Sequence, residues 1–480
     1  MKQFTLTILD QVNVKFTDLD PACRRDIVET LKFMVPYARH TPQFKLGRWD
    51  GKVGFATVGG GTYLNLLDRV VPVLIKHGYS LDNMIIDDRR VNPKFTFEEI
   101  DDEFLADTIW PAGHPFEGEP VMLREHQVDA INRYLNNLQS LQEIATGAGK
   151  TMICAALSRI VEPYGRSLII VPGKDLVRQT YKDYINVGLD TGRYYGDFKE
   201  PSNQHTIATW QSMTALSKNN PEVLEEILSG CNCVIIDESH TIKGNELQKF
   251  LCGAAANVPI RWGLTGTIPK EEFAFLSLLS SVGPVVGSVR ADELQEKGIL
   301  SDCHIHIKQL EDNVSYSTYD AERDFLSTDK RRVEWIAKFC EKIAEKGNTM
   351  VLVNSIELGK RVAEYLDAPF IYGQVKSSVR GKEYDSIDDA DNKTIVATFA
   401  VAGTGISINR LFNLVMVEPG KSFTRTIQSA GRGLRVAEDK NYVDIYDICS
   451  NAKFSKRHLT ARKGYYKDAN YKFTVEKVSY

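Results

Sequence analysis

The sequence lacks any long hydrophobic run. No stretch of about 18 apolar residues occurs in its 480 residues, which argues against a transmembrane helix. The first residues also lack the apolar core and small-residue cleavage site of a signal peptide, and their alternation is typical of a β-strand. Cysteines are few and scattered, and only Cys231 and Cys233 lie close together. We therefore expect a reduced, cytoplasmic protein without structural disulfides.

A strong charge of either sign is also missing. The formal net charge is −4, with 43% hydrophobic and 25% charged residues, which is ordinary globular composition. This balance excludes a largely disordered or collagen-like chain. The net charge also gives the protein no overall positive potential, so a nucleic acid would have to bind at local basic patches. Tandem repeats and low-complexity segments do not occur.

Three segments of different texture follow one another along the chain. Residues 1–112 combine an alternating apolar start, a helix-like segment and two alternating runs around Gly59–Gly61, which predict a β-hairpin. Residues 113–300 and 301–480 each alternate short apolar runs with helical patterns, as in a parallel sheet covered by helices. We predict an α/β protein in which a small α+β N-terminal domain precedes two parallel-sheet domains.

The strongest motif is ATGAGKT, at Ala145–Thr151, which follows an expected strand and opens an apolar helix. Small residues in such a turn let backbone N–H groups surround phosphate oxygens, with Lys150 reaching the β and γ phosphates and Thr151 binding Mg²⁺. The strict pattern has Gly where this chain has Ile144, and a chance Gly-rich turn before a helix is the alternative. The expected phosphate-binding residues are Thr146, Gly147, Ala148, Gly149, Lys150 and Thr151.

A second motif ends an apolar run with strong β propensity. In VIIDESH, Asp237 can hold Mg²⁺ through water, and Glu238 can orient and deprotonate the attacking water. The alternative is an acidic helix start, since Asp and Glu are favoured there. A phosphate-binding turn of this kind requires such a strand, which favours an ATP-hydrolysing site.

The order of these and further motifs resembles that of the superfamily-two helicases over most of residues 121–450. The resemblance implies two RecA-like motor domains in tandem, ATP and Mg²⁺ as cofactors, and adenine contacts at Arg124 and Gln127. The motifs that carry it are LREHQ (Leu123–Gln127), IIVPGKDLVRQ, ATWQS, LTGT (Leu264–Thr267), LVNS (Leu352–Ser355), VATFAVAGTGIS, which includes Gly405, and QSAGRGLR (Gln428–Arg435).

The last of these motifs has a clear chemical role in that family. Arg432 and Arg435 lie three residues apart, on one helical face, and with Gln428 they would stabilise the charge that spreads over the γ-phosphate. The resemblance to the superfamily-two helicases implies that these residues act across the cleft between the two motor domains.

The resemblance also implies two nucleic-acid grips that move past each other as ATP is hydrolysed. Hydroxyls, amides and backbone N–H groups suit phosphate contacts without base readout. For Trp210, packing in the hydrophobic core is equally open. The expected contacts are Gly173, Thr209, Trp210 and Gln211 in the first motor domain and Asn354, Ser355 and Thr398 in the second.

Details of the motifs resemble the DNA-translocating branch rather than the DEAD-box RNA helicases, because the second motif ends in His240 and the third reads TGT. The string FKLGRWDGKVGF resembles the N-terminal DNA-binding module of UvsW-type bacteriophage branch-migration helicases. A buried Trp with solvated charges is the alternative for this segment. Its expected phosphate and base contacts are Lys45, Arg48, Trp49 and Lys52.

Two other features have competing interpretations. The last 30 residues hold eight Lys or Arg against two acids, with interleaved Tyr and Phe. They suit backbone contact plus stacking on DNA, or alternatively a solvated and partly frayed helix. Cys303, His304 and His306 alternate along a run that favours a strand over a metal site.

Together these patterns predict an ATP- and Mg²⁺-dependent DNA helicase or translocase. We expect it to remodel forks and four-way junctions in recombination, repair and replication, in a bacterial host cytoplasm if it is phage-encoded. An RNA helicase and a non-hydrolysing nucleic-acid scaffold are the alternatives. Branched or forked duplex DNA is the expected partner, a membrane is not, and the sequence indicates no protein partner.

Overall fold

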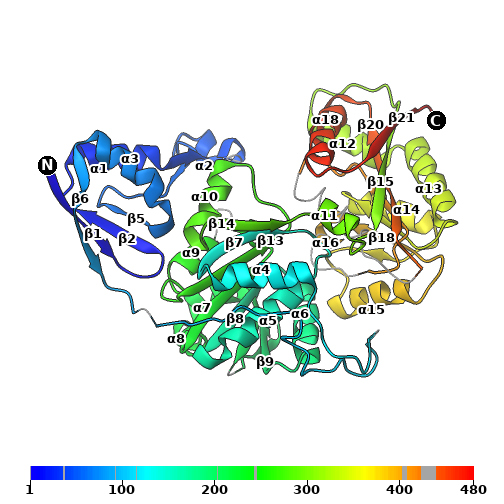
Figure 1. Ribbon diagram of the computed structural model, residues 1–480. Coiled ribbons are helices and arrows are strands. Elements are labelled where there is room, and N and C mark those ends of the chain that lie inside the picture. Colours follow the sequence, from blue (N-terminus) through cyan, green and yellow to red (C-terminus); the bar gives the residue numbers. More distant parts are fainter. Residues whose placement is uncertain are drawn as a thin grey trace. The chain divides into compact units, whose positions relative to one another are not determined.

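A computed structural model describes residues 2–35, 38–91, 93–114, 116–202, 204–242, 246–402, 408–422 and 439–480. The chain forms two compact units. The first comprises residues 1–143, 151–172 and 180–288, and the second comprises 144–150, 173–179 and 289–480. Each unit contains a large sheet with flanking helices (Figure 1). Within the described residues no helix is long and apolar enough to cross a membrane.

A four-stranded sheet begins the first unit, in the order β5-β2-β1-β6. Strand β1 is antiparallel to β2 and parallel to β6, which requires the intervening chain to cross over. Its strands are β1 (Lys2–Ile8), β2 (Asn13–Thr17), β5 (Gly61–Tyr63) and β6 (Tyr79–Asp88), with helices α1 (Pro21–Thr30), α2 (Pro42–Lys45) and α3 (Leu67–Lys76) and the small ribbon β3 (Lys32–Met34) and β4 (Lys52–Gly54). Buried side chains such as Phe4, Phe16 and Leu66 form its core. The core continues into Phe273, whose ring lies 6.0 Å from that of Phe55.

The hairpin predicted around Gly59–Gly61 is wrong. Strand β4 pairs with β3, and β5 pairs with β2, so the two runs that flank the glycines belong to different sheets. An alternating run predicts a strand but does not specify which strand it pairs with, and here β2 and β3 are the partners. The glycine turn itself is tied to β2, because the Phe16 N–H donates to the Gly60 carbonyl over 2.9 Å.

This turn gives a stability prediction. Gly60 has φ +90°, and an added Cβ would lie 2.1 Å from the Phe16 carbonyl oxygen. Gly60→Ala should lower the unfolding free energy by at least about 1–2 kcal/mol, the cost of the left-handed backbone alone. The matched control is Gly59→Ala, whose Cβ would meet nothing nearer than 3.8 Å. Thermal unfolding of both variants tests this, and equal midpoints would contradict it.

The large sheet of the first unit has eight strands in the order β10-β9-β11-β8-β12-β13-β7-β14. From β9 to β7 the paired strands are parallel to one another, and β10 is antiparallel to β9. The strands are β7 (Gln139–Ile144), β8 (Arg166–Val171), β9 (Thr191–Tyr195), β10 (Phe198–Glu200), β11 (His205–Thr209), β12 (Cys231–Asp237), β13 (Ile260–Thr265) and β14 (Val285–Val289). Cys231 and Cys233 are therefore strand residues.

Helices accompany both faces of this sheet. They are α4 (Glu125–Leu135), α5 (Lys150–Val161), α6 (Lys174–Asn186), α7 (Trp210–Asn219), α8 (Pro221–Leu228), α9 (Glu246–Cys252) and α10 (Glu272–Ser281). Met213 of α7 and Phe250 of α9 share one hydrophobic cluster with Ile170 and Ile236 of the sheet. On α4, the Tyr134 hydroxyl donates to the Gly263 carbonyl and fixes that helix to β13.

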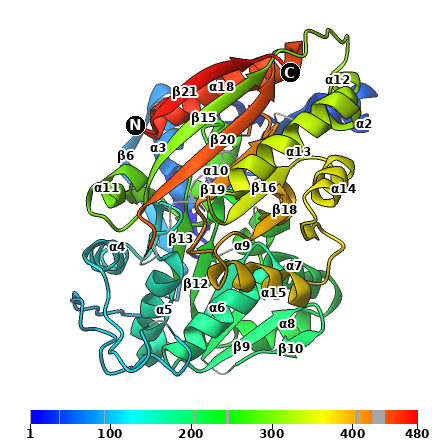
Figure 2. The same ribbon diagram turned by 90° about the vertical axis from the view of Figure 1, so that its right-hand side faces the viewer.

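The second unit holds a seven-stranded sheet in the order β17-β18-β16-β19-β20-β15-β21, in which neighbouring strands are parallel (Figure 2). The strands are β15 (Asp302–Leu310), β16 (Thr349–Val353), β17 (Phe370–Ile371), β18 (Thr394–Thr398), β19 (Asn413–Val417), β20 (Tyr442–Ser450) and β21 (Phe473–Val478). The helices are α11 (Ala291–Glu296), α12 (Tyr319–Thr328), α13 (Lys330–Ala344), α14 (Ile356–Tyr365), α15 (Ser377–Asp388), α16 (Phe399–Ala402) and α18 (Lys453–Asp468).

The α/β class with two parallel-stranded sheets is confirmed. Cys303, His304 and His306 lie on β15, as the strand interpretation expected, and His306 Nε2 lies 2.7 Å from Asp444 of the neighbouring β20. The boundaries at residues 112 and 300 stay predictions.

Candidate functional site

The glycine-rich turn connects β7 directly to α5. Gly147 and Gly149 have φ of 89° and 84°, a backbone conformation that favours glycine. Ile144 is fully buried as the last residue of β7, which explains why this position holds an apolar side chain rather than glycine. Helix α5 then begins at Lys150, so the positive end of its dipole is at the turn. Thr146 and Thr151 are half-buried beside it, and Ala148 is buried.

The acidic motif lies where β12 ends. Asp237 is the last residue of that strand and is only 6% exposed. Glu238 adopts φ 52°, the left-handed region that is strained for a non-glycine residue, and its N–H donates to Asp237 Oδ1 over 2.8 Å. Strain of this kind is typical of functional sites.

His240 links this motif to the LTGT motif after β13. Its Nδ1 lies 3.3 Å from Glu238 Oε2 and 3.0 Å from Thr265 Oγ1. Because the Thr265 hydroxyl donates its proton to the Thr267 carbonyl over 3.0 Å, the imidazole N–H is the donor toward Thr265. One side chain therefore joins the LTGT segment to Glu238.

Sheet topology places the two motifs at one edge. Strands β7, β13 and β12 are parallel neighbours, so Lys150 and Asp237 both follow carboxyl ends. The described residues contain no group of three or more His, Cys, Asp or Glu side chains that could cage a metal. A hydroxyl at Thr151 and a carboxylate at Asp237 nevertheless suit Mg²⁺, which binds one or two protein oxygens and substrate phosphates. The residues at this edge therefore fit ATP with Mg²⁺, and their individual roles stay predictions.

The expected adenine contacts lie at the start of α4. Arg124 is exposed, whereas Gln127 is buried in the first turn of the helix. The Gln127 side-chain oxygen accepts the Arg124 N–H over 2.8 Å, which caps the helix. This bond fixes the orientation of the Gln127 amide. The contact with adenine itself stays a prediction.

Two of the expected nucleic-acid segments of the first motor domain lie side by side, because β8 and β11 are paired and end together. The Gln211 amide donates to the Pro172 carbonyl over 3.5 Å, next to Gly173. Thr209 is buried, and its hydroxyl accepts the Ser212 N–H to cap α7. Trp210 is half-buried against the hydrophobic core, which agrees with the packing interpretation for much of its ring.

The expected contacts of the second motor domain also meet at one sheet edge. Asn354 and Ser355 follow β16, and Thr398 ends the neighbouring β18. Ser355 caps α14, and the exposed Asn354 donates its amide to the Glu418 carbonyl. Asn354, Ser355 and Glu418 line one small cavity together with residues of α12 and α18. Thr398 is only 7% exposed, so its side chain offers little surface to a strand.

The N-terminal basic segment keeps its cations in solvent. Lys45, Arg48 and Lys52 are exposed around α2 and β4. Trp49 is half-buried, and its indole N–H donates to the Lys52 carbonyl over 2.8 Å. Only part of the Trp49 ring is therefore available to a base, while the lysines and the arginine remain available to phosphates.

Four expected site residues lie outside the described part of the chain. They are Gly405, Gln428, Arg432 and Arg435.

A stacking role for two C-terminal tyrosines is wrong. Tyr466 is fully buried, and its hydroxyl donates to Asp447 Oδ2 over 2.8 Å, while Tyr471 is 6% exposed. Of the alternative, a solvated and partly frayed helix, the fraying is wrong, since α18 is a regular helix with a buried face, whereas its opposite face is exposed. Arg462 belongs to that face and binds Asp447 with two bonds of 2.8 Å.

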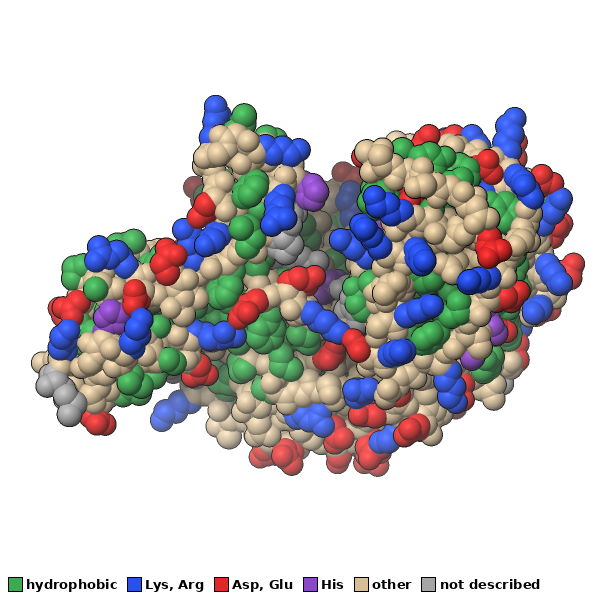
Figure 3. Space-filling view, turned by 90° about the horizontal axis from the view of Figure 1, so that it is seen from above, with side chains coloured by type: hydrophobic (Ala, Val, Ile, Leu, Met, Phe, Trp, Pro, Cys, Tyr) green, Lys and Arg blue, Asp and Glu red, His purple; other side chains and the backbone are tan. Residues whose placement is uncertain are grey.

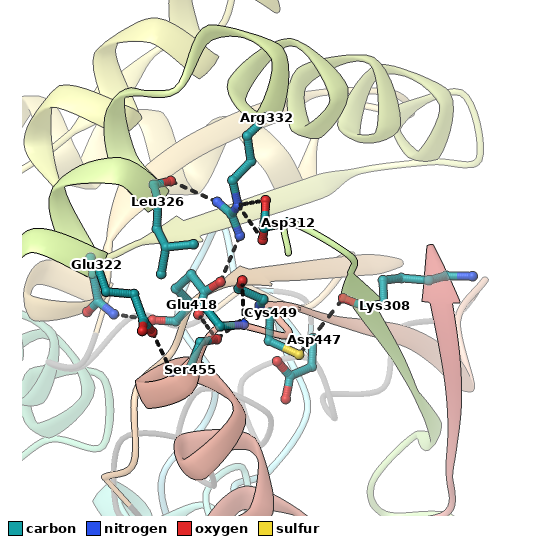
Figure 4. Close-up of polar contacts among 12 residues, drawn as sticks. Lys308, Asp312, Glu322, Leu326, Arg332, Glu418, Asp447, Cys449 and Ser455 are labelled. Carbon is teal, nitrogen blue, oxygen red and sulfur yellow. Dashed lines mark hydrogen bonds and ion pairs between the residues drawn. The ribbon is translucent and has the colours of Figure 1, made fainter. Parts of the chain in front are cut away.

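A buried polar cluster that was not predicted from the sequence lies around Glu418, which follows β19 (Figure 4). Arg332, fully buried, donates to Glu418 over 2.7 Å and pairs with Asp312. Burial raises the pKa of Glu418, and Arg332 opposes that shift. The Glu418 carboxylate also accepts the Ser455 hydroxyl over 2.6 Å. The only signal in the sequence was an acid at the end of an apolar run, LVMVEP, since nothing marked Arg332 as its partner.

Comparison with known proteins agrees with this architecture. A family model for the type III restriction enzyme res subunit matches residues 120–270, and a model for the helicase conserved C-terminal domain matches residues 331–437. The ATP-dependent DNA helicase uvsW of Enterobacteria phage T4 is 23% identical over 93% of this chain and 91% of its own length. A putative DNA 3'-5' helicase Rad25 of Halobacterium salinarum is 26% identical over 69% of this chain and 57% of its own length.

Among solved structures, a fragment of a putative HsdR subunit of a type I restriction enzyme from Vibrio vulnificus has the same fold. Its TM-score is 0.55 at 17% identity, with 90% of this chain and 77% of that chain covered. The two parallel sheets are thus tandem RecA-like domains, as predicted. The chain is an ATP-dependent helicase of superfamily two. Within that superfamily it resembles the UvsW-type bacteriophage helicases.

Proposed function

We propose that the protein uses ATP hydrolysis to translocate on DNA and to remodel branched DNA such as forks and four-way junctions. The observation that carries the ATPase part is the common sheet edge at which the Lys150 turn and the Asp237–Glu238 pair end. The similarity to T4 uvsW, which extends over nearly the whole of both chains, supports DNA as the substrate. The same similarity favours a role in recombination, repair and replication in a phage-infected host cytoplasm.

We assign roles by chemistry at that edge. Backbone N–H groups of Thr146–Gly149 and the Lys150 ammonium bind the phosphates. Thr151 and Asp237 hold Mg²⁺, which neutralises charge on the β and γ phosphates when it is bound. Glu238 accepts the proton of the attacking water. Gln428, Arg432 and Arg435 carry the guanidinium and amide chemistry that stabilises charge developing on the γ-phosphate.

We place the DNA contacts of the motor domains at the carboxyl ends of the strands in the two sheets. Gly173, Thr209 and Gln211 supply backbone and polar groups in the first motor domain, and Asn354 and Ser355 do so in the second. The exposed cations Lys45, Arg48 and Lys52, with Trp49, add a contact outside the motor domains. These groups would contact phosphates, so we expect the protein to recognise the shape of DNA rather than its base sequence.

The ATPase rate with different nucleic acids tests this proposal. At one fixed salt concentration, single-stranded DNA, linear duplex, forked DNA, a four-way junction and RNA are compared. We expect stimulation by DNA, several-fold stronger with branched than with linear duplex. Stimulation by RNA alone would make the protein an RNA helicase, and absence of turnover with every ligand would make it a scaffold. Equal stimulation by linear and branched duplex would contradict the proposed preference for branched DNA.

A further inference from the structure

On one face of α18 all the charged residues are cations. The helix runs from Lys453 to Asp468. Its outward side carries the exposed Lys453, Lys456, Arg457 and Lys467 and the half-buried Lys463, which together we call the cationic face. At 3.6 residues per turn these five positions fall within an arc of about 120°, in which the other two residues are Thr460 and Gly464. No acidic residue occurs in α18 before Asp468. The five charges are therefore concentrated along a stripe about 21 Å long.

The charges of this face are not neutralised locally. No ion pair joins any of the five residues to an acid within the parts of the chain that the structure describes. Helix α13 differs, because Lys338 pairs with Glu334 one turn away. Figure 3 shows Lys and Arg side chains gathered on the second unit, viewed from the end at which α18 lies in Figure 1. The protein has a net charge of −4, so this stripe is a local concentration of positive charge that would attract an anionic partner.

The helix beneath the stripe is held rigidly. Its buried face inserts Ser455, Leu459, Arg462 and Tyr466 into the second unit. The carboxylate of the buried Glu322 accepts the N–H groups of Phe454 and Ser455 over 3.0 and 2.7 Å and so caps the first turn (Figure 4). Five long side chains on a fixed helix can present their charges in one line. A Cβ at Gly464 would meet nothing within 4 Å, so the surface is open there.

The N-terminal end of the stripe adjoins a predicted DNA contact. Ser455 and His458 of α18 line the same cavity as Asn354 and Ser355. Aromatic rings lie at this end, with Tyr319 at 5.9 Å from Phe454 and 5.5 Å from His458, measured between ring centroids. Tyr319 is 41% exposed. Cations in a line next to an exposed ring, Tyr319, and an exposed amide, Asn354, are a combination that can bind a nucleic-acid backbone and stack a base.

We propose that the cationic face of α18 binds the sugar–phosphate backbone of DNA, extending the contact proposed at Asn354 and Ser355. This inference rests on the proposed function, because it takes DNA as the substrate. The stripe is long enough to follow about six phosphates of one strand of a B-form duplex. Contacts to phosphates carry no base information, so we expect binding along the stripe to be independent of sequence.

The test measures the salt dependence of DNA binding. The quadruple variant Lys456→Gln, Arg457→Gln, Lys463→Gln, Lys467→Gln is titrated with a labelled single strand and with the matching linear duplex. Losing four phosphate contacts should lower the slope of log affinity against log salt by about 3 for the single strand and reduce affinity at least about tenfold. Basal ATP hydrolysis without DNA should stay at the wild-type rate, since none of the four residues belongs to the nucleotide site.

Two matched variants separate charge from structure. Lys330→Gln, Lys338→Gln, Lys342→Gln, Lys346→Gln removes as many cations from and just after α13 and should keep the wild-type slope. Lys456→Arg, Lys463→Arg, Lys467→Arg keeps the charge of α18 and should also keep it. A wild-type slope in the glutamine variant of α18 would overturn this inference while leaving the proposed function intact. A wild-type protein without DNA binding would overturn the proposed function itself.

Discussion

Glu238→Gln should lower kcat for DNA-stimulated ATP hydrolysis by at least about 100-fold, because general-base catalysis contributes roughly 10²–10⁴. The amide keeps the shape of the carboxylate and can still contact His240, which lies 3.3 Å from Glu238. It cannot accept a proton from the attacking water. ATP and DNA affinities should therefore stay within a few-fold of wild type. Single-turnover hydrolysis together with equilibrium binding of both ligands measures these two effects separately.

The matched control for this prediction is Glu225→Gln, an exposed position on α8 in the same unit. It removes one carboxylate without touching the nucleotide edge and should leave kcat unchanged. Hydrolysis by the Glu238 variant at the wild-type rate would exclude Glu238 as the base. Loss of ATP binding along with hydrolysis would instead indicate that the strained φ of 52° at this residue serves the structure of the turn.

The nucleotide edge could be predicted because its residues are local in sequence. The turn before Lys150 and the strand that ends at Asp237 each carry their signal within a few residues, and parallel pairing then brings both carboxyl ends to one edge. The link from His240 to Thr265 joins residues 25 positions apart and could not be predicted from either motif. The hydrogen bond that the Gln127 side chain accepts at the start of α4 could not be predicted from its motif either.

Features that depend on long-range packing were predicted poorly. The glycine turn at Gly60 has the local pattern of a hairpin, but β2 and β3 provide the partners for its flanking strands. Nothing in the C-terminal pattern separates Arg462, which is buried, from Arg457, which is exposed. The distinction depends on Asp447 of β20, a carboxylate that only the fold places beneath α18.

This buried pair gives the largest expected effect on stability. Burial alone lowers the pKa of Arg462, but the adjacent Asp447 charge more than compensates and raises it. Arg462→Met removes the guanidinium and leaves Asp447 fully buried, with the Tyr466 hydroxyl as its remaining donor among these three side chains. Breaking a buried pair in this way costs roughly 3–5 kcal/mol. Since Arg462 also donates to the Gly420 carbonyl over 2.7 Å, the loss should extend beyond α18 to the segment that follows β19.

Hydrogen exchange of peptides from β20 and α18 measures this loss locally, which suits a protein whose two units need not unfold together. Arg457→Met is the matched control on the same helix and should exchange like wild type, because Arg457 is exposed. The double variant Arg462→Met, Asp447→Asn should recover part of the protection, because it leaves no unpaired charge in the interior. If these peptides exchanged as slowly in Arg462→Met as in the wild type, the Arg462–Asp447 pair would not be what stabilises the position of α18. The rigid support that the cationic face requires would then have to come from Glu322 and the apolar contacts of Leu459.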